Sequence, residues 1–137
     1  MTKRKKGRSA QFVRLFHRLL DDPQYIALSH PAKTLLVDVA MQYTGKNNGD
    51  LAITLSMMKK RGWSSNSTLN RALKKLIKAE WLILTRQGGR HKCSLYALTW
   101  ESIDECGGKL EVKPTTTPLR PLSFRTEKIK SLVLKKA

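Results

Sequence analysis

The chain has 137 residues, of which 27 are Lys or Arg and 10 are Asp or Glu, so its formal net charge at pH 7 is +17. A chain this basic repels itself unless it meets a polyanion, so nucleic acid is the expected partner, ahead of an anionic membrane surface. The length fits one domain with tails, and no apolar stretch approaches the ~20 residues of a membrane span. Two cysteines make no disulfide framework, so we expect a reduced cytoplasmic protein without a secretory signal.

The cations are clustered along the chain rather than spread evenly. Residues 1–9 form a basic arm that we expect to be disordered. A second block spans residues 59–92, where the only acid is Glu80, and a third spans residues 109–136. Residues 10–58 are nearly balanced in charge. The pattern therefore indicates one basic face and two basic tails.

The first half of the chain carries helical signals. Phe12–Phe16 alternates weakly and is compatible with a short strand or the start of a helix. The pair Asp21-Asp22 precedes a proline and indicates a break between short helices. Ser29 is a suitable cap for a helix whose early proline is Pro31, and apolar residues then recur at helical spacing until Gly45, where we expect the helix to end.

A short strand and a short helix are predicted next. Residues 51–53 are apolar and follow a turn-forming sequence. Thr54 is a suitable cap for a helix over residues 55–61, and Gly62 would stop it.

The most informative segment follows, a helix predicted over residues 65–80 with Ser65 as its cap. Its residues separate onto two sides at helical spacing. The apolar side holds Leu69, Ala72, Leu73, Leu76 and Ile77. The opposite side holds Asn70, Arg71, Lys74, Lys75 and Lys78. Such a helix can be anchored in a small domain and still enter the DNA major groove; the alternative is an ordinary solvated amphipathic helix.

A β-hairpin is predicted after this helix. Residues 81–85 and 94–100 are rich in strand-forming side chains, and Gly88-Gly89 lies between them. The residues around the two glycines are mostly basic, so the hairpin should have a basic tip, unless the tip is polar only because it is exposed.

The composition changes again at residue 107. Glycine, proline and threonine are typical of an extended linker, and residues 126–136 carry apolar side chains at helical spacing but are too few for a stable isolated helix. We therefore expect a basic arm (1–9), one domain (10–106) and a linker with a short amphipathic tail (107–137).

Several dispersed pieces of the sequence carry a resemblance to a known family. They are Phe-Val-Arg-Leu at Phe12–Leu15, an Asn-Asn-Gly turn at Asn47–Gly49, and Ser-Thr-x-x-Arg-Ala-Leu at residues 67–73, followed by the hairpin. Over about residues 29–100 the order of elements resembles the winged helix-turn-helix family, and especially its small members from bacterial, phage and plasmid genomes. The resemblance implies an α+β fold, mostly helical with a C-terminal hairpin as its wing, and association with a bacterial nucleoid.

Helix-turn-helix units place their second helix in the major groove, where its N-terminal residues touch base edges. The residues in that position here are Asn66, Ser67, Thr68, Asn70 and Arg71. Amides pair well with adenine and guanidinium with guanine, while hydroxyls pair with either. Phosphate contacts are expected from Ser65, Lys74, Lys75, Lys78, Arg86, Arg90, His91 and Lys92. The arm supplies minor-groove contacts or only non-specific affinity, through Lys3, Arg4, Lys5, Lys6 and Arg8.

Catalytic signals are weak. The sequence has no glycine-rich phosphate motif, His-Glu metal motif or nucleophile elbow, so we expect no enzyme and no cofactor. His91, Cys93 and Cys106 lack the spacing of a zinc site. Trp63 and Trp81 flank the basic helix and are expected to seal it to the core.

The sequence therefore predicts a sequence-specific double-stranded DNA-binding protein that acts as a transcriptional regulator. One alternative is a replication or plasmid-maintenance factor of a mobile element, in which residues 107–137 would recruit a protein partner. A second alternative is an RNA-binding winged-helix protein, although the aromatic residues look like core rather than a base-stacking platform. A homodimer is compatible with any of these, but the sequence identifies no dimer surface.

Overall fold

The computed structural model describes residues 10–122, so the predicted arm (1–9) and the last fifteen residues lie outside the described residues. The helices are α1 (His17–Leu20), α2 (Pro23–Ile26), α3 (His30–Ala40), α4 (Leu55–Met58), η1 (Lys59–Arg61), α5 (Asn66–Lys78) and η2 (Cys106–Gly108). None of the helices in this part of the chain is long and apolar enough to cross a membrane.

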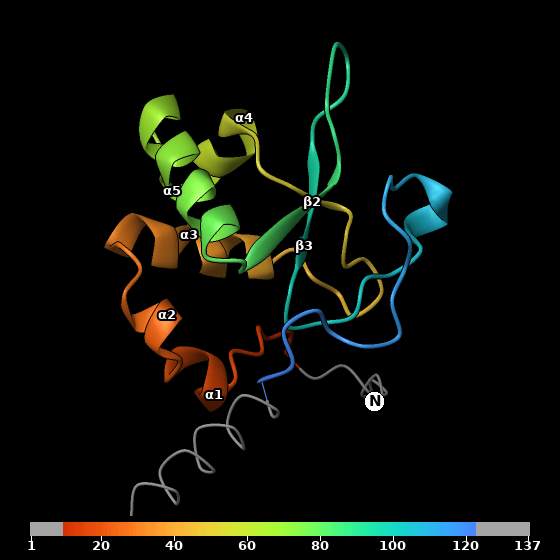
Figure 1. The fold of residues 1–137 in the computed structure, drawn as a ribbon. Coiled ribbons are helices and arrows are strands. Elements are labelled where there is room, and N and C mark those ends of the chain that lie inside the picture. Colours follow the sequence, from red (N-terminus) through yellow and green to blue (C-terminus); the bar gives the residue numbers. More distant parts are fainter. Residues whose placement is uncertain (1–9, 123–137) are drawn as a thin grey trace, which may run out of the picture.

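Three strands form a small antiparallel sheet: β1 (Leu51–Ala52), β2 (Leu82–Arg86) and β3 (Leu95–Leu98). Their order is β1-β3-β2, so the β2–β3 hairpin is extended by β1 at the edge of β3. Helices α3 and α5 pack against each other beside the sheet (Figure 1). The predicted α+β class is confirmed.

Helix α3 begins as predicted, where Ser29 Oγ accepts a hydrogen bond from the Ala32 amide and a proline occupies the first turn. It ends at Ala40, however, and the prediction that it continues to Gly45 was wrong. The reason is a tertiary contact. The Gln42 side-chain amide donates to the Ala52 carbonyl at 2.7 Å and accepts from the Ala52 amide at 3.0 Å, which holds the chain after α3 against the edge strand β1.

The segment that leads into α5 forms as predicted. Thr54 Oγ1 accepts from the Met57 amide at the start of α4. Gly62 then ends the following turn with φ of 96°, a left-handed conformation that glycine adopts without strain. Ser65 Oγ accepts from the Thr68 amide and caps α5.

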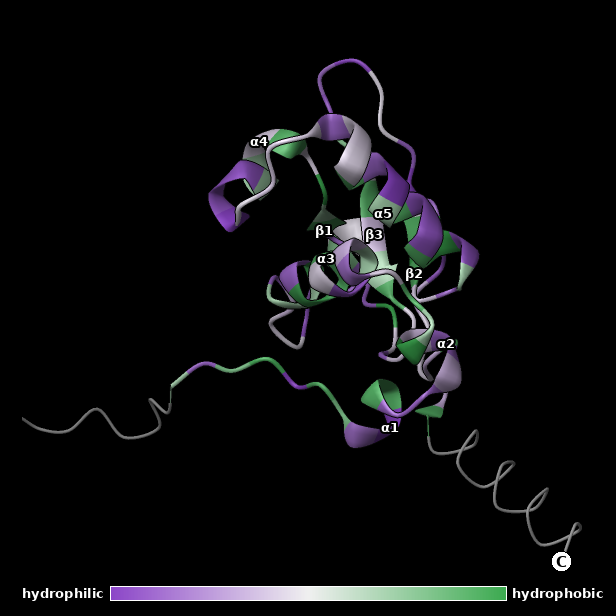
Figure 2. Cartoon of the chain, turned by 90° about the vertical axis from the view of Figure 1, so that its left-hand side faces the viewer, coloured by the Kyte–Doolittle hydropathy of each residue, from purple (hydrophilic) through white to green (hydrophobic). Residues whose placement is uncertain are grey.

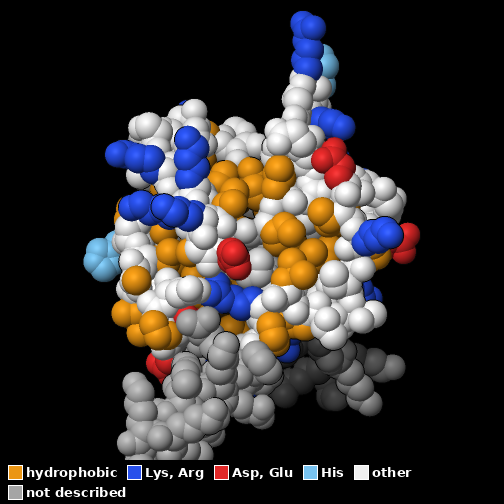
Figure 3. Space-filling view, viewed as in Figure 1, with side chains coloured by type: hydrophobic (Ala, Val, Ile, Leu, Met, Phe, Trp, Pro, Cys, Tyr) orange, Lys and Arg blue, Asp and Glu red, His pale blue; other side chains and the backbone are white. Residues whose placement is uncertain are grey.

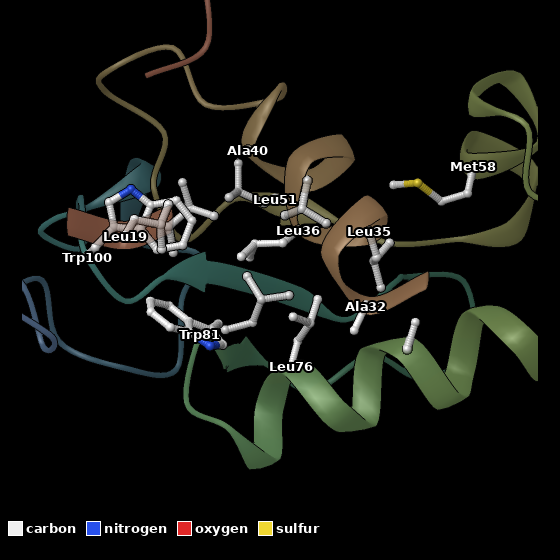
Figure 4. Packing of buried hydrophobic residues seen from close by; sticks show 14 of the residues in the cluster. Leu19, Ala32, Leu35, Leu36, Ala40, Leu51, Met58, Leu76, Trp81 and Trp100 are labelled. Atoms are coloured by element: carbon white, nitrogen blue, oxygen red, sulfur yellow. The ribbon is translucent and has the colours of Figure 1, made fainter. Parts of the chain in front are cut away.

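The core lies between α3, α5 and the sheet, and Figure 4 shows its side chains converging from all three. Trp81 is fully buried and Trp63 is 8% exposed, so both seal α5 to the body as predicted. The Trp81 ring meets the edges of Tyr25 and Trp100 at centroid distances of 6.3 and 6.2 Å. The Arg120 guanidinium covers it at 3.6 Å.

Asn48 ties the loop before β1 to the end of the hairpin. Its side chain is completely buried, and its Nδ2 donates to the carbonyls of Leu98 at 2.9 Å and Ser102 at 2.9 Å. Its Oδ1 accepts from the Leu98 amide at 2.7 Å. Because a buried amide is costly when unpaired, these bonds fix the loop in one position.

Two segments without regular structure complete the body. Residues 10–16 form neither a strand nor a helix, so both expectations for Phe12–Phe16 were wrong. None of the three described strands pairs with this segment. Residues 107–121 are irregular outside η2, and they lie on the body. The Arg120 amide donates to the Thr99 carbonyl at 2.7 Å, and Leu122 joins the core.

Candidate nucleic-acid interface

Helix α5 is held by one side and leaves the other side in solvent. Leu69, Ala72 and Leu76 are buried against the core. The exposed residues include four of the five predicted base readers and the three predicted phosphate contacts of the helix: Asn66, Ser67, Asn70, Arg71, Lys74, Lys75 and Lys78. We call this set the basic face. The fifth predicted reader, Thr68, is half-buried.

The start of α5 is fixed by a buried carboxylate that the sequence did not single out. Asp38 on α3 is 7% exposed, and it accepts a hydrogen bond from Trp63 Nε1 at 2.8 Å. It also accepts from Arg61 Nε at 3.3 Å. Both donors belong to the turn between α4 and α5, so Asp38 couples the position of that turn to α3. The sequence contained one signal for this role, because Asp38 is an acidic residue among the apolar positions of a predicted helix.

Ser65, a predicted phosphate contact, is the N-cap of α5. Its hydroxyl accepts from the Thr68 amide at 3.3 Å and lies 3.0 Å from the Ser67 hydroxyl. The first turn of α5 contains no acidic residue. The N-terminal end of α5, where backbone N–H groups favour anions, therefore has no carboxylate competing for it within the helix.

The hairpin presents a second group of cations. Arg90, His91 and Lys92 are exposed at its tip, which is closed by an isolated bridge between Gly89 and Lys92. Gly88 is required by the close approach of the two arms, since a Cβ at this position would lie 2.4 Å from the Ser94 amide nitrogen. The predicted glycine-centred hairpin with a basic tip is confirmed.

Arg86 lies elsewhere than predicted. It is the last residue of β2 rather than part of the tip, and it is half-buried. Its Nη2 donates to the Cys93 carbonyl at 2.9 Å, so the guanidinium links the two arms of the hairpin. Glu111 supports the same region, because its amide donates to the Thr85 carbonyl at 2.8 Å and its Oε1 accepts from the Gln87 amide at 3.0 Å.

The start of α5 and the hairpin tip lie toward the same end of the body. Figure 1 shows the hairpin tip, α4 and the N-terminal end of α5 at that end, and Figure 2 shows the same grouping after a quarter turn. Lys and Arg side chains gather over α5 and again at the projecting tip, with apolar side chains between them (Figure 3). The predicted arm contacts Lys3 to Arg8 lie outside the described residues.

Residues 10–122 contain no candidate metal site. No three His, Cys, Asp or Glu side chains in that range are grouped to hold an ion, and Cys93 and Cys106 are both free thiols. Burial, together with the nearby Asp50 and Asp104, raises the pKa of the Cys106 thiol. Burial also raises the pKa of Glu101. Both groups lie outside α5 and the hairpin tip.

No model of a known protein family matches the chain, and the comparisons with curated proteins and with solved structures found no match.

Proposed function

We propose that this chain is a winged helix-turn-helix protein that binds double-stranded DNA in a sequence-specific manner and acts as a transcriptional regulator. Helix α5 enters the major groove. Its N-terminal half reads base edges, and its lysines and the hairpin tip contact phosphates.

The basic face of α5 carries the proposal. It combines amide, hydroxyl and guanidinium groups near the helix start with Lys74, Lys75 and Lys78 further along, and no acid. The buried side of the helix is anchored in the core, so these groups keep a fixed spacing. Fixed donors and acceptors are what direct readout of bases requires, while the lysines supply the attraction to phosphates that is independent of sequence.

The hairpin tip supports the proposal from a second element. Arg90 and Lys92 are exposed and lie at the end of the molecule to which the start of α5 points (Figure 1). A DNA duplex placed against α5 would extend past the hairpin tip, so Arg90 and Lys92 would contact the phosphate backbone of the DNA. Arg86, which links the arms of the hairpin, supports the wing without contacting phosphate in this arrangement.

Binding to defined duplexes over a salt series tests the general mode. If ~6–8 phosphates are neutralised, the logarithm of the affinity should fall with the logarithm of the salt concentration at a slope of about −5 to −7. A flat salt dependence would contradict phosphate binding. Competition with duplex RNA and single strands should leave duplex DNA as the strongest ligand, and stronger duplex RNA binding would favour the RNA-binding alternative.

Substitutions on the basic face test sequence reading. After the preferred site is selected from random duplexes, Arg71→Ala or Asn70→Ala should cost about 1–3 kcal/mol on that site and far less on unrelated duplexes. Lys75→Ala should weaken binding to the preferred site and binding to unrelated duplexes to the same extent. The matched control is Lys46→Ala, which removes an exposed cation outside the basic face. If Arg71→Ala and Asn70→Ala both leave discrimination intact, α5 does not read the bases.

A further inference from the structure

Residues 107–122 contact both elements of the candidate interface. At one end of this segment the Glu111 amide donates to the Thr85 carbonyl at the base of the hairpin. Near the other end, Arg120 contacts the C-terminal end of α5. Leu122 is 9% exposed and joins the core, which anchors the segment behind Arg120. The segment is therefore placed to influence how α5 sits relative to the hairpin.

The guanidinium of Arg120 caps α5. Its Nη1 donates to the Ala79 carbonyl at 3.0 Å and more weakly to the Glu80 carbonyl at 3.4 Å. Its carbon atom lies 3.6 Å from the centroid of the Trp81 ring. The last carbonyls of a helix have no partner inside the helix and carry partial negative charge. A cation that stacks on a buried ring beside them satisfies these carbonyls in a fixed geometry.

The backbone at this end of α5 depends on outside contacts. Glu80 has a φ of 62°, a left-handed conformation that costs energy for a residue with a side chain. Its carbonyl accepts a hydrogen bond from Thr99 Oγ1 at 2.7 Å. Thr99 directly follows β3, and its own carbonyl accepts from the Arg120 amide at 2.7 Å. Arg120 therefore joins the end of α5 to the end of the hairpin through both its side chain and its backbone.

A third element completes this set of contacts. Arg120 Nη2 donates to the side-chain oxygen of Gln24 on α2. The guanidinium thus lies between α2, the end of α5 and the Trp81 ring, and a planar group with several donors suits such a position better than a lysine would.

The direction of α5 has a large effect at its other end. The helix has 13 residues, which corresponds to a length of about 20 Å. A tilt of about 3° at the C-terminal end of a helix this long moves its N-terminal end by about 1 Å. A shift of that size spoils the distance and angle of a hydrogen bond to a base edge, whereas it changes the attraction between a lysine and a phosphate very little.

We propose that Arg120 is a positioning residue for α5. By fastening the end of the helix to Thr99 and Gln24, it sets the direction in which residues 66–71 point, and through that direction it sets how well the protein distinguishes its preferred DNA site from other duplexes. The effect on DNA rests on the proposed function, whereas the direction of α5 is a property of the free protein. Arg120 acts at the opposite end of α5 from the base readers.

Residual dipolar couplings of backbone amides in the full chain without DNA test the effect on direction. Arg120→Ala should change the couplings of α5 relative to those of α3. Arg120→Lys keeps the charge and a donor, so it protects the fold and should change the couplings in the same sense by a smaller amount. The matched control is Lys113→Ala, which removes an exposed cation from the same segment and should change nothing. Couplings of α5 that stay as in wild type in both Arg120 variants overturn the proposal.

Titrations of preferred and unrelated duplexes, at a temperature where every variant is folded, test the effect on DNA reading. Arg120→Ala should lower the ratio of the two affinities at least about fivefold, as expected when one base contact is lost. It should leave the salt slope unchanged, because no phosphate contact is removed. Lys113→Ala should leave the ratio unchanged. A purely structural role would lower the melting temperature of Arg120→Ala without changing the ratio.

The outcomes separate this proposal from the proposed function. If wild type discriminates between duplexes and Arg120→Ala discriminates equally well, Arg120 does not position α5 for reading, although the proposed function stands. If Arg120→Ala weakens both duplexes equally and makes the salt slope shallower by about 1, Arg120 is a phosphate contact and the proposal is overturned. If wild type shows no preference for any duplex, the proposed function fails together with the effect on DNA, and the dipolar couplings alone decide whether Arg120 sets the direction of α5.

Discussion

Helix α5 and the hairpin tip both carry exposed cations, but they are attached to the body in different ways. Three side chains of α5 are buried, its first turn is capped by Ser65, and the turn before it is tied to Asp38. The tip is closed by a single bridge between Gly89 and Lys92, and its support from Glu111 lies at its base. A base edge must be met within hydrogen-bond distance, whereas a phosphate attracts a cation over several ångströms. The difference therefore suits α5 to reading sequence and the tip to adding affinity.

The largest expected effect comes from loosening α5. Leu76→Ala removes a fully buried side chain and should lower the free energy of unfolding by about 2–5 kcal/mol. Its neighbour Ile77 is 38% exposed, so Ile77→Ala should change stability by less than about 1 kcal/mol. Urea unfolding measures both. Equal losses would mean that α5 is not anchored through its buried side.

A smaller effect is expected from the carboxylate behind the turn. Asp38→Ala leaves the Trp63 indole N–H without its acceptor and should cost about 1–3 kcal/mol. Asp38→Asn keeps an oxygen for Trp63 and loses the ion pair with the half-exposed Arg61, which should cost about 0–1 kcal/mol from the pair itself. Asp21→Ala, at an exposed acid, is the control for loss of negative charge. Denaturation midpoints rank the stabilities of the three variants. If Asp38→Ala is as stable as wild type, Asp38 does not anchor the turn before α5.

The hairpin should respond locally. Gly88→Ala introduces a Cβ that would meet the Ser94 backbone, whereas Gly89→Ala introduces one with no atom within 4 Å. We expect Gly88→Ala to lower the opening free energy of hairpin amides by about 1 kcal/mol or more, with little change in those of α5. Hydrogen exchange measures both groups of amides. If α5 amides lose as much protection, the hairpin and α5 form one cooperative unit.

The smallest effect is expected from the cations at the tip. Replacing Arg90 and Lys92 together by Ala should make the salt slope of DNA binding shallower by about 2, since each phosphate contact contributes about 0.9. The preferred sequence should stay the same. Titrations of preferred and unrelated duplexes test this, with Lys46→Ala as the charge control. A changed sequence preference would show that the tip also reads bases.

Features encoded over a few residues could be predicted from the sequence. Ser29, Thr54 and Ser65 cap the helices that follow them, because a cap depends on a hydroxyl and an amide three residues away. The hairpin around its two glycines was predicted for the same reason, since turn geometry is local.

Features that depend on distant contacts could not be predicted. The end of α3 depends on the pairing of Gln42 with Ala52, and Arg86 lies in β2 because the strand continues one residue past the predicted end. Asp38 and Glu111 act on residues far away in the chain, Trp63 and Gln87, and no local pattern reveals those partners. For the candidate interface, the polar and basic side chains could therefore be predicted from the sequence, whereas the buried contacts that position them could not.

The hydrogen bonds of Asn48 also bear on how the molecule ages. Asn48 precedes Gly49, and an Asn-Gly pair in a free chain is prone to deamidation, in which the next backbone nitrogen attacks the side-chain amide. Here that amide is buried and held by Leu98 and Ser102, so it cannot rotate toward the backbone. Deamidation would replace an N–H donor with a carboxylate that faces carbonyl oxygens, and an unfolded chain that aged in this way could not rebuild the loop. The chemical lifetime of the protein is thus coupled to the time it spends folded.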